Sequence, residues 1–188
     1  MPWTEEKRKQ VRNKREKQIL SAALELFAFK GYHNTTMEDI SKKAGIAKGL
    51  IYKYFDSKEK LFETMINSLT DIFTKYIPEK PPEEFTDDDM VELLISFFRD
   101  IEENYLYWRV FHTVVVQSGA TDYFMTILNR YQTELKNYFT IYFSKKTDDV
   151  DLYFELYYVF VEGLALTFVV KPDLDYVKMI KVFVSKLS

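Results

Sequence analysis

The chain has 188 residues, 47% of them hydrophobic, and a formal net charge of −3 at pH 7, which fits one or two domains with a sizeable core. The absence of Cys excludes disulfides, thiol nucleophiles and thiolate metal sites. With only two His and no recognisable nucleophile–base pair, we expect no catalytic residue, no metal and no cofactor. An enzyme with an all-helical aromatic pocket is the weaker alternative.

The first part of the chain is basic and the remainder is acidic. Residues 1–60 hold 14 Lys or Arg and 8 Asp or Glu, a balance of +6, whereas residues 61–188 have a balance of −9. The basic residues before the first apolar stretch are Lys7, Arg8, Lys9, Arg12, Lys14, Arg15 and Lys17. They form either a solvated extension of the first helix or an arm that follows phosphates or enters a minor groove. In both cases the charge asymmetry favours attraction to nucleic acid phosphates.

No segment indicates export or membrane insertion. The basic amino terminus has no apolar run behind it, so no signal peptide is recognisable. The strongest apolar run, Leu156 to Val170, has 15 residues and contains Glu162, which is short for a membrane span and is typical of a buried helix. We expect a cytoplasmic protein without a membrane partner.

Two short helices joined by a turn are predicted between residues 36 and 55. Met37, Ile40 and Ala44 form one apolar face of the first helix, and Gly45 follows where a positive φ is needed. The second helix is expected from Lys48 to Phe55. Helices joined by such a turn form a helix-turn-helix, whose second helix enters the DNA major groove.

The exposed face of the second helix is suited to DNA. Lys48 can reach a base edge or a phosphate, Gly49 allows close approach of the backbone, and Tyr52 and Lys53 can contact phosphates. Thr36 stands at the N-cap of the first helix, whose N–H groups can face another phosphate. The alternative is that a short Lys-rich helix is only a solvated face of an all-helical protein.

Longer motifs favour the DNA-binding interpretation. The segment from Ile19 to Phe62 contains, in order, AALELF, KGY, TTMEDISKKAGIAKGLIYKYF and SKEKLF. This set, which covers about a third of the chain, resembles the amino-terminal DNA-binding domain of the TetR family of bacterial transcriptional repressors. The resemblance implies a three-helix DNA-binding domain over residues 1–57, followed over residues 58–188 by a helical domain for ligand binding and dimerisation.

The resemblance also implies which residues contact DNA. Thr36, Lys48, Gly49, Tyr52 and Lys58 match positions that usually do so in the family. Two further positions of the predicted contact set depart from the family pattern: Leu50 stands where a polar residue is frequent, and Lys53 where His or Tyr is frequent. The operator sequence therefore cannot be carried over.

The rest of the chain is predicted to be helical, giving an all-α fold of about nine helices. Asp56 and Glu59 fit a capping pair for the next helix, and Pro78 begins a proline-rich linker. Four or five helices follow, one of them capped by Thr86 and another by Asp148 or Asp149.

Aromatic residues concentrate after residue 60, with 25 of the 32 Phe, Tyr and Trp. Stripes of this kind are usually core packing, but an aromatic cavity with a few polar groups is also a common small-molecule site. The family resemblance implies an inducer site. The predicted lining residues are Phe98, Tyr105, Trp108, Phe111, His112, Tyr131, Tyr157 and Glu162. His112, which has apolar neighbours, can instead be a satisfied core residue.

Glu162 lies in a segment that is apolar nearly all round. A buried carboxylate is costly without a partner. It therefore faces solvent at a helix edge, pairs across a subunit interface or meets a polar or cationic ligand.

The helix expected near residues 151–170 is apolar on more than one side, and the one near 175–187 is rich in apolar residues, which favours a two-fold dimer. The predicted interface residues are Val159, Gly163, Leu166, Val177, Ile180 and Val184. The resemblance implies the same four-helix contact. The sequence thus predicts a homodimeric repressor that binds a palindromic operator on double-stranded DNA and is released by a small-molecule inducer. The alternative is a constitutive DNA-binding or interaction protein without an inducer.

Overall fold

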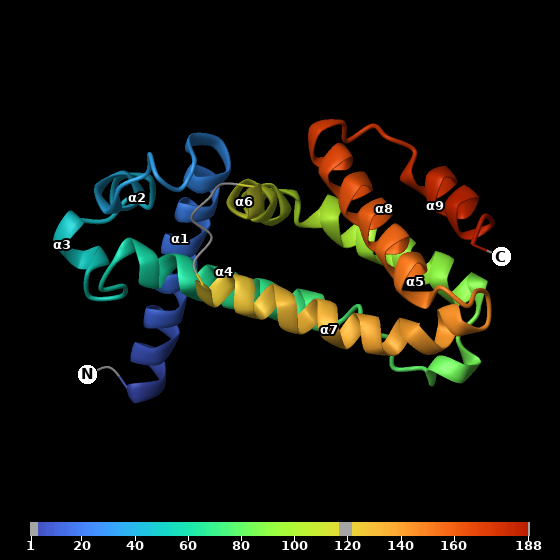
Figure 1. Ribbon diagram of the computed structural model, residues 1–188. Helices are drawn as coiled ribbons and strands as arrows, with labels where there is room; N and C mark the ends of the chain where they lie inside the picture. The colour runs from blue at the N-terminus through green and yellow to red at the C-terminus, as the bar shows by residue number, and fades with distance from the viewer. Residues whose placement is uncertain (1–3, 117–121, 188) are drawn as a thin grey trace. The chain divides into compact units, whose positions relative to one another are not determined.

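The computed structural model describes residues 4–116 and 122–187, without the side chains of residues 68–74, 114–116, 122–124 and 127. Within these residues the chain forms nine α-helices, one 3₁₀ helix and no strand, which confirms the predicted all-α fold (Figure 1). The elements are α1 (Glu5–Lys30), α2 (Met37–Lys43), α3 (Lys48–Ile51), α4 (Lys58–Thr74), η1 (Pro82–Glu84), α5 (Asp87–Glu103), α6 (Tyr105–Val116), α7 (Asp122–Ser144), α8 (Val150–Val170) and α9 (Tyr176–Val184).

The chain divides into two compact units. The amino-terminal unit comprises Met1–Leu69 and Arg109–Gly119, and the carboxy-terminal unit comprises Thr70–Trp108 and Ala120–Ser188. The helices α4 and α6 therefore each continue from one unit into the other. The functional boundary predicted between residues 57 and 58 stays a prediction. By packing, the first turns of α4 belong to the amino-terminal unit, because Phe62 is buried with its ring 5.9 Å from that of Phe27.

The core of the amino-terminal unit fixes α2 and α3 on α1. Ile19 and Phe27 of α1, Ile40 of α2 and Ile51 of α3 are all fully buried. The side-chain amide of Gln18 donates a hydrogen bond to the carbonyl oxygen of Ala44 at 2.6 Å. This bond ties α1 to the end of α2, so the two short helices have a fixed support.

Local sequence determines where α2 begins and ends. Thr36 and Asp39 form a capping box at its start, in which the Asp39 N–H donates to the Thr36 hydroxyl at 3.1 Å. After the helix, Gly45 has φ +64°, a conformation that side chains with a Cβ rarely adopt. Both features agree with the sequence prediction.

The second helix of the motif is shorter than predicted. It was expected to extend to Phe55, but α3 ends at Ile51 and a turn continues to Tyr54. The N–H groups of Lys53 and Tyr54 bond to the carbonyls three residues earlier, at 3.1 and 3.0 Å, rather than four. The α-helix therefore tightens into 3₁₀-like turns after one turn.

The carboxy-terminal unit has an aromatic core. Phe98 of α5, Phe139 of α7 and Phe168 of α8 are buried, and Tyr157 of α8 has its ring 5.0 Å from that of Phe139. Along the chain α7 packs with α8, and α5 packs with α9. The cap of α5 is Thr86, in a second capping box with Asp89, and the cap of α8 is Asp149.

The helix α8 extends further than the apolar run that was expected to be buried. It has 21 residues, and by length and composition alone it is apolar enough to cross a membrane. About a third of its most apolar window is buried within the chain. Five apolar side chains of α8 are exposed in the single chain, which bears on the dimer surface described below: Leu152, Leu156, Val159, Leu166 and Val170.

Candidate functional site

Most of the predicted DNA contacts in α3 and in the turn that follows it are exposed. Lys48, Gly49 and Lys53 are exposed, Tyr52 is 46% exposed, and Leu50 is half-buried. A Cβ added at Gly49 would meet no atom within 4 Å. Packing inside the protein therefore does not require a glycine at this position. A molecule outside the protein, however, could approach the backbone more closely at Gly49 than at a residue with a side chain.

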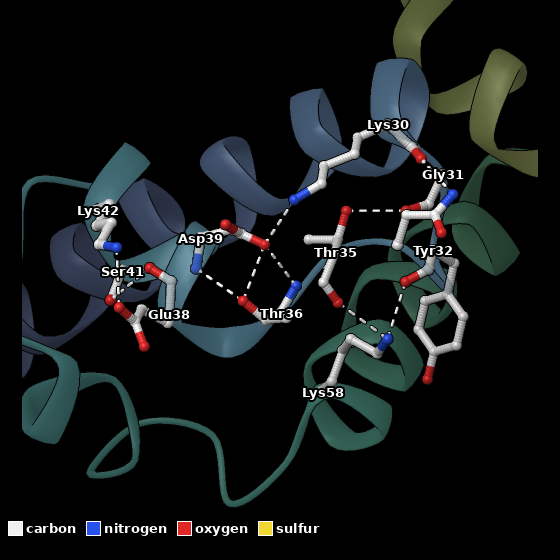
Figure 2. Close-up of polar contacts among 11 residues, drawn as sticks. Lys30, Gly31, Tyr32, Thr35, Thr36, Glu38, Asp39, Ser41, Lys42 and Lys58 are labelled. Carbon is white, nitrogen blue, oxygen red and sulfur yellow. Dashed lines mark hydrogen bonds and ion pairs between the residues drawn. The ribbon is translucent and has the colours of Figure 1, made fainter.

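Thr36 is exposed, but its polar groups are already used within the protein (Figure 2). Its N–H and its hydroxyl both donate to Asp39 Oδ2, at 3.0 and 2.8 Å. The same oxygen accepts from Lys30 Nζ at 2.8 Å. These bonds hold the pKa of the Asp39 carboxyl well below its usual range, first through Lys30 and then through Thr36. The start of α2 is thus rigid, and Thr36 contributes to its order.

Lys58 is directed toward the loop that precedes α2 (Figure 2). Its ammonium group donates to the carbonyl oxygens of Tyr32 and Thr35, at 2.8 and 3.0 Å. The resemblance assigned Lys58 a DNA contact. In the free protein its first role is to fix the loop between α1 and α2 to the start of α4.

The lysines near α3 have an acidic partner. Glu38 of α2 pairs with Lys42 at 2.8 Å and with Lys48 at 2.7 Å. Hydrogen bonds from Lys42, and secondly from Lys48, lower the pKa of Glu38 to about 2. A DNA phosphate that binds Lys48 therefore has to compete with this carboxylate.

A second basic surface lies beside α3. Arg8 and Arg12 of α1 line an open concavity of about 290 Å³ together with Leu50, Lys53 and Tyr54. The helix α1 begins at Glu5, so the basic segment is a helical extension rather than an extended arm. The sequence showed the charges of Arg8 and Arg12. It could not show that they lie next to Lys53, because that depends on how α1 crosses the motif.

A cavity of about 30 Å³ lies inside the carboxy-terminal unit. Its walls come from α5, α7, α8 and the residue Tyr76 after α4, and they are mainly aromatic and aliphatic. The lining residues are Tyr76, Leu93, Leu94, Phe97, Tyr131, Leu135, Tyr157, Tyr158, Val161 and Glu162. Three predicted ligand residues, Tyr131, Tyr157 and Glu162, meet here. Sequence reasoning missed Tyr76 and Tyr158, although Tyr158 was adjacent to a predicted residue.

The other predicted ligand residues do not line this cavity. Phe98 and Trp108 are buried as core packing, and the Tyr105 hydroxyl donates to the carbonyl oxygen of Val169 at 2.9 Å. Phe111 and His112 belong to the amino-terminal unit. Burial lowers the pKa of His112 to about 4, so it is neutral at physiological pH. Among the described residues, no group of three or more His, Asp or Glu side chains is placed to hold a metal ion.

The predicted dimer residues divide into two groups. Val159, Gly163 and Leu166 of α8 are exposed, and Val177 of α9 is half-buried. Ile180 and Val184 are 0% and 2% exposed, so they pack within their own subunit and are not available at its surface. The exposed side of α9 carries Met179 and Val182 instead, together with Lys178 and Lys181.

Comparison with known proteins identifies the amino-terminal region. Residues 19–65 match the sequence model of the family described as bacterial regulatory proteins, tetR family. A second match is the biofilm operon icaADBC HTH-type negative transcriptional regulator IcaR of Staphylococcus epidermidis, with 30% identity over 88 residues. The amino-terminal region therefore belongs to the TetR family of bacterial regulatory proteins. The IcaR match covers 47% of this chain and 48% of IcaR, so the chain spans about half the length of the curated relatives it matches.

Solved structures extend the likeness in fold beyond the amino-terminal unit. The fatty acid degradation regulator FadR from Bacillus halodurans is 22% identical, with a TM-score of 0.73 over 92% of this chain and 94% of that one. FadR from Bacillus subtilis, in complex with stearoyl-CoA, is 24% identical, with a TM-score of 0.69 over 90% and 96%. At these identities the likeness shows a TetR-like fold and not a shared ligand.

Proposed function

We propose that the protein is a DNA-binding transcriptional repressor. It binds a palindromic operator in the cytoplasm as a homodimer and is released when a small molecule binds in the carboxy-terminal unit. The observation that carries this proposal is the exposure of Lys48 and Gly49 on α3 and of Tyr52 and Lys53 in the turn that follows it. A hydrogen bond from Gln18 of α1 to the carbonyl of Ala44 supports the motif from behind. Such a surface can read base edges while neighbouring cations contact phosphates.

Exposed apolar side chains support the homodimer. Along α8 they recur at spacings of four and three residues, the pattern of a helix that packs on a partner helix. The set is Leu152, Leu156, Val159, Leu166 and Val170, with Gly163 in the same register. A two-fold dimer would cover this stripe and present two copies of α3 to two half-sites about 34 Å or somewhat further apart.

Release by a ligand requires that the ligand bind the DNA-free form more tightly than the DNA-bound form. The cavity beside Glu162 is the site proposed for it. The FadR complex with stearoyl-CoA gives a precedent for a small molecule on a similar fold, but not for its chemistry here. The alternative function is a constitutive DNA-binding or interaction protein whose affinity for DNA no compound changes. Enzymatic turnover of a bound compound would contradict both.

Selection of genomic DNA fragments by the purified protein at near-physiological salt tests the proposal. Recovery of one or a few palindromes supports a sequence-specific dimeric regulator. Recovery of only diffuse, salt-sensitive binding contradicts it, since phosphate attraction alone gives that result. A variant with Tyr52→Phe and Lys48→Ala is the matched control, and it should bind the recovered palindromes more weakly than the wild type. Both side chains are exposed, so the two substitutions leave the core unchanged.

A further inference from the structure

The cavity of the carboxy-terminal unit contains one carboxylate, that of Glu162 on α8. The hydroxyl of Tyr158 donates a hydrogen bond to it, which favours the charged carboxylate but does not offset the effect of burial. The Tyr158 oxygen in turn accepts a hydrogen bond from the side-chain amide of Gln132 on α7. The hydrogen bonds thus run from Gln132 through Tyr158 toward the carboxylate. A neutral hydroxyl satisfies part of its hydrogen-bonding capacity but does not balance a full negative charge.

No cation balances that charge from the walls. Among the described residues that line the cavity, none is Lys, Arg or His. The basic residues of α7 are engaged elsewhere, since Arg130 pairs with Glu134 at 2.9 Å and Lys136 pairs with Asp151 at 2.8 Å. The sequence of α8 contains no basic residue. Burial accordingly raises the pKa of Glu162.

The other residues that line the cavity are suited to a cation that carries an apolar group. Tyr157 is buried and Tyr131 is half-buried, and their rings are of the kind that attract a positive charge through the π-face. An anion is disfavoured at this site, because it would be placed beside a carboxylate of the same sign with no cation to offset the repulsion. A purely apolar molecule would leave the charge of Glu162 desolvated.

We propose that this cavity is a binding site for an organic cation, whose positively charged nitrogen pairs with Glu162 and whose apolar part lies against Tyr131 and Tyr157. The inference rests on the proposed function in that it names the class of its ligand. That class differs from stearoyl-CoA, the anionic molecule bound to FadR of Bacillus subtilis.

The size of the cavity makes binding a conformational event. A cavity of about 30 Å³ is far smaller than the roughly 300–1,000 Å³ of an ordinary ligand pocket, so an organic cation enters only when the lining side chains move outward. A ligand that requires such a rearrangement has different affinities for the closed and open forms. This difference is what allows a ligand to shift an equilibrium.

Calorimetric titration of the purified full chain tests the ligand class. The probes are benzyltrimethylammonium and phenylacetate, which share an aromatic ring and have opposite charges. We expect saturable binding of the cation and none of the anion. In Glu162→Gln the cation affinity should fall at least about tenfold, which corresponds to ~1.4 kcal/mol. The control is Glu155→Gln, which removes the same charge from an exposed position one heptad earlier on α8 and should bind like the wild type.

Three results would overturn the inference: no saturable cation binding at millimolar concentration, tighter binding of phenylacetate, or unchanged cation binding in a folded Glu162→Gln variant. If that variant does not fold, the pH dependence of the wild type decides. Cation affinity should fall as the pH is lowered, because protonation of Glu162 removes the charge, and the raised pKa of Glu162 brings this loss to a higher pH than for an ordinary carboxyl. The other titratable groups facing it are the hydroxyls of Tyr76, Tyr131, Tyr157 and Tyr158, all with raised pKa values, and the α5 lining residues do not titrate. A flat pH profile would contradict the proposal.

DNA selection on the same samples separates this inference from the proposed function. Specific operator binding without cation binding would contradict the proposed ligand class but still support the proposed function as a regulator. Cation binding by a protein that selects no DNA sequence would support the proposed cation site and contradict the proposed function as a sequence-specific regulator.

Discussion

The ammonium group of Lys58 donates a hydrogen bond to the carbonyl oxygen of Tyr32 at 2.8 Å and lies 4.3 Å from the centre of the same residue's ring. A second bond, to the carbonyl of Thr35, closes the loop before α2 onto the first turn of α4 (Figure 2). A position that by family resemblance contacts DNA therefore also orders the support of the DNA-binding motif.

Replacement of this lysine should destabilise the protein. We expect Lys58→Met to lower the free energy of unfolding by about 1–3 kcal/mol, because two carbonyl groups lose a charged donor. Urea unfolding measures this change. The control is Lys60→Met, since Lys60 pairs with Glu63 at the surface and an exposed pair contributes at most ~1 kcal/mol. Equal stability of the wild type and Lys58→Met, with weaker DNA binding, would show that the DNA contact is its main role.

A substitution at Gly49 can separate an effect on the close approach of DNA from an effect on folding. In the free protein a Cβ at this position meets no atom within 4 Å, and Ala favours a helix more than Gly. Gly49→Ala should therefore leave the thermal midpoint unchanged or raise it slightly, and should weaken operator binding. Fluorescence anisotropy with a labelled operator measures the second effect. Unchanged affinity would mean that no DNA group comes close to Gly49.

Glu38 should act against DNA binding. It pairs with Lys42 and Lys48, and a phosphate must displace it from Lys48. Glu38→Gln removes the competing charge, so operator affinity should rise several-fold and the gain should shrink at high salt. A Glu25→Gln variant is the matched control, because Glu25 pairs with Lys43 and not with a residue of α3. Weaker binding in Glu38→Gln would indicate that Glu38 positions Lys48 for its contact.

Rules that depend on neighbouring residues predicted much of this fold. The features that depend on long-range packing could not be predicted in the same way. Thr36, Thr86 and Gly45 were recognisable because caps and turns depend on neighbouring residues. The start of α4 was misassigned by one residue: the predicted cap was Asp56, whereas the hydroxyl of Ser57 accepts the N–H of Lys60 at 3.2 Å. Both residue types cap helices, so the sequence did not distinguish them.

The cavity and the dimer surface were harder to predict for a different reason. Phe98 and Tyr157 are both aromatic residues on apolar stripes, yet only Tyr157 lines the cavity. On α9 apolar residues occur on the exposed face as well as on the buried one, so apolar character alone could not show that Ile180 faces inward and Val182 outward. The choice depends on how α9 packs with α5, which no local pattern encodes.

The capping box of α5 should make stability depend on pH. The Asp89 carboxylate accepts hydrogen bonds from Lys80 and from Thr86, which lower its pKa to about 2. A lowered pKa means that the carboxylate stabilises the fold above its unfolded-state pKa, and that this contribution is lost as the pH falls through the folded-state value. Asp89→Asn should therefore be less stable than the wild type at pH 7, and the difference should shrink between about pH 4 and pH 2. Urea unfolding at several pH values measures it, and a difference that does not change with pH would contradict this explanation.

The exposed stripe on α8 should hold two subunits together. Val159 is 65% exposed at the middle of the stripe, and in a two-fold interface one substitution alters the contact from both subunits. Val159→Asp places two unpaired charges in an apolar contact, so sedimentation at micromolar concentration should change from dimer to monomer. Ile141→Asp introduces the same charge at an exposed apolar position of α7 and should remain dimeric.

Ile180→Ala should instead lower the stability of each subunit by about 2–5 kcal/mol, because the side chain of Ile180 is buried in the core of its own subunit. A wild-type protein that sediments as a monomer would contradict the dimer, and with it the palindromic operator, because one copy of α3 can occupy only one half-site.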